Sequence, residues 1–120
     1  MKRVFIAWLA LLFFAGVLAA KTPPLKYHYT TAPESSFQKG LWRDSSVTDK
    51  LYTDAVEAGQ KLGIPTPNKV IPIQDAGHFV PNKPPIVQPS NRYPGGGTDF
   101  VNPNRVPPEA ILPARPIGGR

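Results

Sequence analysis

The chain contains no cysteine among its 120 residues. Disulfide bonds, thiol catalysis and disulfide-linked oligomers are therefore excluded. Histidine is nearly absent, because only His28 and His78 occur, and no group of His, Asp and Glu has the spacing of a metal site. We expect no cofactor, no metal and no enzymatic activity.

Residues that build a hydrophobic core are also scarce. After residue 20 the chain has 21 Leu, Ile, Val and Phe residues, against 16 Pro and 9 Gly. Such a composition lies close to that of disordered chains. Small secreted domains compensate for a thin core with disulfides, which this chain cannot form. The sequence therefore predicts a mostly disordered, irregular, proline-rich chain with one short amphipathic helix and no large core.

The first twenty residues have the three parts of a secretory signal peptide. Two positive charges precede a run of seventeen uncharged, mostly apolar residues, 4–20, which ends in small residues before Lys21. We predict cleavage after Ala19 or Ala20. An uncleaved membrane anchor is the alternative, since seventeen residues lie at the short limit for a span. Cleavage would give a secreted, extracellular chain without a stable membrane span.

The segment after the signal peptide divides into a linker and a helix. Residues 21–45 contain aromatic side chains without a helical or strand period, and we interpret them as a linker. Residues 46–62 are predicted to form an amphipathic helix that Ser46 caps. Gly63 is the expected C-terminal stop.

Residues 63–120 are predicted to form a basic, extended tail, because proline interrupts every helical window. The tail repeats a pattern of Pro, Asn, a cation and then apolar residues and Pro. Gly95-Gly96-Gly97 is interpreted as a flexible joint between units. An extended, proline-rich chain is suited to insertion into a groove on a partner. The candidate partner-binding residues are Pro81, Asn82, Lys83, Pro103, Asn104, Arg105, Arg115, Pro116 and Ile117.

The end of the chain, Pro107 to Arg120, contains Pro-Ala-Arg-Pro-Ile at 113–117. With the repeated Pro-Asn-Lys/Arg upstream, it resembles the insect proline-rich immune peptides of the drosocin, pyrrhocoricin and apidaecin kind. The resemblance implies an infection-induced, secreted peptide that binds an intracellular bacterial target in extended form. Gly119-Arg120 also resembles a substrate for C-terminal amidation.

Charge is compatible with this interpretation. Residues 21–120 carry 12 basic and 8 acidic side chains, a net charge of +4, which gives a mild attraction to anionic surfaces. We therefore predict a secreted innate-immune effector that acts on an anionic bacterial surface or an intracellular bacterial target, or on another extracellular protein. The alternatives are a structural protein of matrix, cuticle or seminal fluid, and a precursor of secreted signalling peptides.

Overall fold

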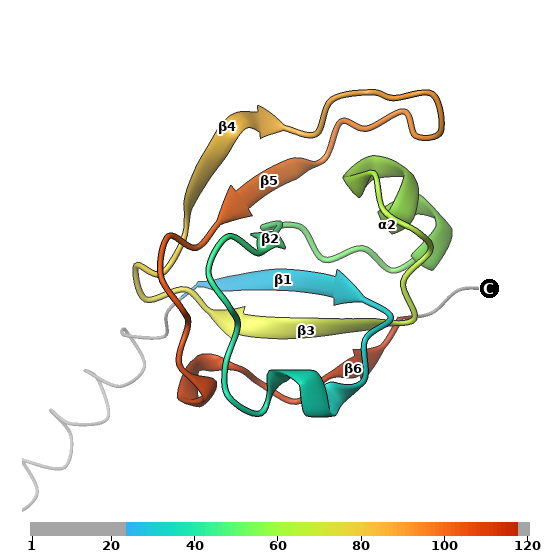
Figure 1. Ribbon diagram of the computed structural model, residues 1–120. Coiled ribbons are helices and arrows are strands. Elements are labelled where there is room, and N and C mark those ends of the chain that lie inside the picture. Colours follow the sequence, from blue (N-terminus) through green and yellow to red (C-terminus); the bar gives the residue numbers. More distant parts are fainter. Residues whose placement is uncertain (1–23, 118–120) are drawn as a thin grey trace, which may run out of the picture.

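A computed structural model describes residues 24–117, in which six β-strands and one helix account for the regular structure apart from two short 3-10 turns (Figure 1). The predicted signal peptide, residues 1–20, and its cleavage sites Ala19 and Ala20 lie outside the described residues. Within residues 24–117, no helix is both long and apolar enough to cross a bilayer. The elements are β1 (Leu25–Thr30), η1 (Glu34–Phe37), β2 (Ser46–Val47), α2 (Ala55–Leu62), β3 (Lys69–Gln74), β4 (Val80–Ile86), β5 (Thr98–Val101), η2 (Pro108–Ala110) and β6 (Arg115–Pro116).

The strands form two three-stranded antiparallel sheets, in the orders β1-β3-β6 and β2-β5-β4. One pair of residues joins them. The Tyr27 amide donates to the Thr48 carbonyl over 2.8 Å, and the Thr48 amide donates to the Tyr27 carbonyl over 2.9 Å. The strands therefore follow one another in the order β6-β3-β1-β2-β5-β4, and β4 and β6 are the outer edges (Figure 1).

Strand β3 is central and almost completely buried, although it contains a proline. Pro72 lies opposite Tyr27 in β1. Because Tyr27 uses its own N–H and C=O on Thr48, the missing N–H of Pro72 removes no bond between β1 and β3. Proline in a sheet is otherwise confined to edges and bulges, and the place of Tyr27 in the hydrogen-bond pattern explains this exception.

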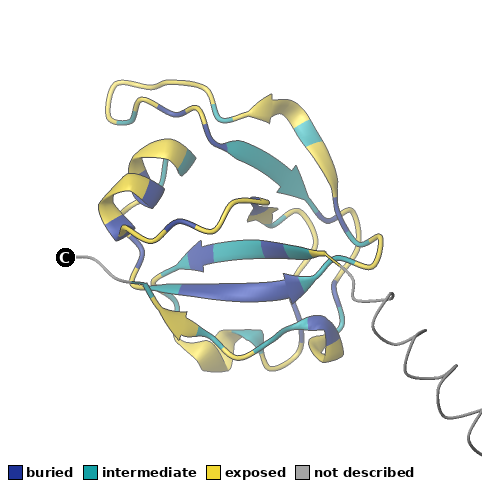
Figure 2. Cartoon of the chain, turned by 180° about the vertical axis from the view of Figure 1, so that it is seen from behind, coloured by how far each residue is buried: buried dark blue, intermediate teal, exposed yellow. Residues whose placement is uncertain are grey.

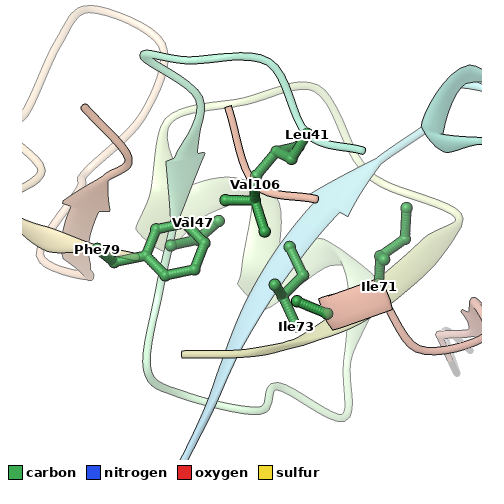
Figure 3. Close-up of a cluster of buried hydrophobic side chains, with 7 residues drawn as sticks. Leu41, Val47, Ile71, Ile73, Phe79 and Val106 are labelled. Atoms are coloured by element: carbon green, nitrogen blue, oxygen red, sulfur yellow. The ribbon is translucent and has the colours of Figure 1, made fainter. Parts of the chain in front are cut away.

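The main core lies between the two sheets and is built from residues far apart in the sequence. Its buried members, which we call the first cluster, are Leu41, Val47, Ile71, Ile73, Phe79, Val106 and Ala110 (Figure 3). Val106 and Ile73 have no exposed surface. In Figure 2, β3 is mostly dark blue, the colour of buried residues, whereas β4 is mostly yellow, the colour of exposed residues.

A second cluster holds the helix against β1 and β3. It consists of Tyr29, Tyr52, Ala58 and Val70. Tyr29 and Tyr52 pack edge to face, with ring centroids 5.7 Å apart. Ala58, which is fully buried, and Leu62 pack α2 against this cluster.

The prediction of a mostly disordered chain is wrong, because the chain folds into these two sheets around two clusters. The composition is close to the threshold for disorder, but the few apolar residues pack together into the two buried clusters. Ile71, Ile73 and Phe79 come from the predicted tail and pack with Leu41 and Val47 from the segments before it. Contacts at such separations leave no periodic signal in the sequence.

The predicted helix 46–62 is also too long. α2 begins at Ala55, and Asp54, not Ser46, caps it by accepting from the Val56 amide over 3.2 Å. Ser46 lies in β2 instead. The end was predicted correctly, since Gly63 follows the helix in the left-handed conformation. Pairing of Ser46 and Val47 with β5 stabilises the extended backbone there.

The region 63–120 contains β3, β4, β5 and β6 and is therefore not a separate tail. The glycines predicted to be a flexible joint have fixed partners. The Gly95 and Gly97 amides donate to the carbonyls of Gln60 and Lys61 in the last turn of α2, each over 3.0 Å. Gly96 donates to Val87. The triglycine thus satisfies carbonyls that a helix end leaves without partners.

Candidate functional site

A cavity of about 310 Å³ lies between β1, the β4–β5 pair and the end of α2. Figure 1 shows these elements around it: β5 and β4 are drawn above β1, with α2 to one side. The volume falls at the lower end of the range of about 300–1,000 Å³ for small-molecule sites. The apolar part of the wall consists of Val47, Leu62, Ile64, Pro84, Ile86 and Val87.

The aromatic wall comes from β1. Side chains alternate along a strand, so Tyr27 and Tyr29 share one face, and both line the cavity. Tyr29 is fixed, because its hydroxyl donates to the Lys50 carbonyl over 3.0 Å and accepts from the Tyr52 amide over 2.6 Å. Burial raises the pKa of Tyr29 to about 12. Tyr27 is half-buried, and its hydroxyl has no hydrogen bond to any residue in the described range 24–117.

The opposite wall carries a carboxylate. Asn82 in β4 donates from Nδ2 to Oδ2 of Asp99 in β5 over 2.9 Å. The amide is itself oriented, because Asn82 Oδ1 accepts from the Lys83 amide over 2.8 Å. The second oxygen, Oδ1 of Asp99, has no hydrogen bond to a residue within 24–117. Asp99 is half-buried, and no Lys or Arg lines the cavity.

A chain of hydroxyl groups ties this wall to β2. Thr98 donates to Asp49 Oδ1 over 2.6 Å, so its oxygen accepts the proton of Thr48, 2.6 Å away. Thr48 is fully buried and lines the cavity. The same residue pairs with Tyr27 through its backbone, so the two walls are held at a fixed separation.

His28 also borders the cavity, although the alternation along β1 turns its side chain to the face opposite Tyr27 and Tyr29. Its Nδ1 lies 2.9 Å from the Ser46 carbonyl, an acceptor, so Nδ1 carries a proton. The ring packs edge to face on Phe37, with centroids 5.5 Å apart. Burial lowers the pKa of His28, and the bond to Ser46 opposes this only in part. The imidazole is therefore neutral at pH 7, and within residues 24–117 Asp99 is the one formally charged residue of the lining.

The predicted partner-binding residues are not brought together. Pro81, Asn82 and Lys83 lie in the edge strand β4, whereas Arg115 and Pro116 form β6 at the opposite edge. Ile117 packs on the second cluster. Pro103, Asn104 and Arg105 lie in the exposed turn after β5, where the Arg105 guanidinium donates to the Lys39 carbonyl. Of the nine residues, only Asn82 lines the cavity.

Neither Tyr27 nor Asp99 was among the predicted site residues. Asp99 lies in the segment interpreted as an extended tail, and Tyr27 in the segment interpreted as a linker. The alternation of Leu25 to Thr30 was the available signal for a strand, but nothing local indicates that this strand faces Asp99. In the region 24–117, no group of three or more His, Asp or Glu side chains is placed to hold a metal ion.

The arrangement can hold an apolar molecule that also carries a hydrogen-bond donor or a positive charge. A partly buried carboxylate oxygen is stabilised by either group. The chain has no significant match among protein-family models, curated proteins or solved structures.

Proposed function

We propose that this chain is an exported protein that binds a small organic molecule in the cavity between β1, β5 and α2. One observation carries the proposal: the cavity combines mostly apolar walls with Tyr27 on one side and an unshared oxygen of Asp99 on the other. Concave, mostly apolar sites with a few placed polar groups are the usual form of ligand pockets. Export rests on the predicted signal peptide.

Binding of indole to residues 21–120 tests this proposal, because these residues contain every described strand and both clusters. Indole is flat and apolar, and we expect saturable binding with shifts in the amide resonances of the cavity-lining residues. Ile86→Trp should abolish the binding by filling the cavity, since Ile86 lines it.

Val80→Trp is the matched control. Val80 lies in the same edge strand, is similarly exposed (45% against 41% for Ile86) and does not line the cavity. It should bind indole like the unmodified chain. Equal loss of binding in both variants, or no saturable binding at all, would refute the proposal.

A role as an immune effector is a second proposal, and the exposure of the two edge strands favours it. Lys83 on β4 and Arg115 on β6 are exposed, extended and accessible to an anionic bacterial surface. Because residues 63–120 depend on contacts with Leu41 and Val47, the whole exported chain, not a tail peptide, is the sample for bacterial growth assays at low salt. Absence of growth inhibition would leave the matrix and precursor hypotheses.

A further inference from the structure

We propose that the cavity selects a planar aromatic amine in its cationic form, with the ring against Tyr27 and the ammonium group on Asp99. This inference rests on the proposed function and specifies the ligand class of the same site. It starts from two polar groups of the lining that have no hydrogen bond to a residue within 24–117, the Tyr27 hydroxyl and Asp99 Oδ1.

The charge of the site favours a cation. Among the described residues that line the cavity, Asp99 is the only formally charged one, because His28 is neutral and no Lys or Arg contributes. Asn82 holds Oδ2, so that Oδ1 remains for a ligand. An ammonium donor and a carboxylate form a charge-assisted hydrogen bond, which is stronger than a neutral one. A phosphate or carboxylate ligand would meet repulsion instead.

The shape and chemistry of the other walls favour a flat ring. Tyr27 packs against the second cluster beside Leu62 and Ile64, and all three line the cavity. Aromatic rings stack on a tyrosine face or meet it edge to face, and a cationic ligand gains a further attraction to that face. The volume of about 310 Å³ accommodates a bicyclic ring with a short side chain.

Three probes with the same ring test the inference on residues 21–120. They are tryptamine, a cation; indole, which is neutral; and indole-3-propionate, an anion. We expect tryptamine to bind about tenfold more tightly than indole, and indole-3-propionate to bind more weakly than either. Added salt should weaken tryptamine binding and leave indole binding unchanged.

Asp99→Asn isolates the charge, because the new amide keeps the shape of the side chain. It should reduce tryptamine affinity about tenfold and change indole affinity less than twofold. Asp44→Asn is the matched control, since it removes the same charge from an exposed carboxylate outside the cavity, and should change neither. Tyr27→Leu should weaken both tryptamine and indole.

The outcomes separate the ligand class from the proposed function. Suppose that Ile86→Trp abolishes indole binding but tryptamine binds no more tightly than indole-3-propionate. This result would overturn the preference for a cationic ligand and would still support a cavity that binds small organic molecules. No saturable binding of any probe would overturn both. If Asp99→Asn does not fold, as judged from its amide spectrum, the order of the three probes and the salt dependence still decide.

Discussion

The imidazole of His28 lies between the Ser46 carbonyl and the ring of Phe37. Burial lowers its pKa in the folded chain, whereas in the unfolded chain it has its ordinary value, about 6.5. Between these two values the unfolded state binds more protons than the folded state. The free energy of unfolding therefore rises with pH across this window. The contribution of His28 to it is complete above about pH 6.5.

We predict that the urea midpoint of residues 21–120 falls as the pH is lowered from 7.5 to 5, and that His28→Asn removes part of this fall. The asparagine amide can still donate to the Ser46 carbonyl but does not titrate. Identical pH profiles for His28→Asn and the unmodified chain would contradict the assignment.

Lys26 shows why some single residues could not be predicted. A lysine in a short alternating segment is normally interpreted as a surface residue, but Lys26 is only 8% exposed. Its ammonium lies 2.6 Å from Asp75 and 4.7 Å from the centre of the Phe100 ring. Both partners are more than forty residues away along the chain, so nothing near Lys26 indicates its burial.

At the scale of elements, the triglycine 95–97 is a structural corner. Gly95 has φ +70°, and a Cβ atom there would lie 2.6 Å from the Val87 carbonyl oxygen. That carbonyl accepts from Gly96, and Val87 itself lines the cavity. The close backbone approach thus holds the two arms of the β4–β5 connection together, and the bonds from Gly95 and Gly97 to the last carbonyls of α2 place this corner against the helix.

Gly95→Ala should lower the free energy of unfolding by about 2–3 kcal/mol. This loss adds the cost of holding alanine in the left-handed conformation to the cost of the steric clash. Gly77→Ala is the comparison, because Gly77 has φ +83° but open space around its Cα, and should cost about 1 kcal/mol. Urea denaturation of both variants measures the difference. Equal losses would show that the close approach at Gly95 contributes nothing.

The sequence predicted the end of α2 but not its beginning. Gly63 is a local signal and acts where expected. Val47 and Leu51 matched the helical period by chance, as Ser46 matched a cap. Pairing of Ser46 with Val101 and of Val47 with Phe100 makes the backbone there extended instead. The two units of the repeat that begin at Phe79 and Phe100 are neighbours, since Val80 pairs with Val101 and Pro81 with Phe100. The repeat could be recognised in the sequence, but only the pairing register of β4 and β5 shows that its two units lie side by side.

At the scale of the whole molecule, composition gave the wrong fold class. The chain has few apolar residues, but those of the first cluster come from all parts of residues 41–110 and bury one another. The prolines within the described strands lie in the edge strands β4 and β6 or, for Pro72, opposite Tyr27. Of the site, only Asn82 was predicted, because Tyr27 and Asp99 become neighbours of one cavity only after the sheets join at Thr48.

The central claim is that the proline-rich half of the chain is a folded sheet that completes the cavity. Nuclear Overhauser effects in residues 21–120 test it most directly. We expect cross-strand effects between Val80 and Val101 and between Tyr27 and Thr48, together with dispersed amide resonances from β3 to β6. Random-coil shifts throughout 63–120, with none of these cross-strand effects, would contradict it.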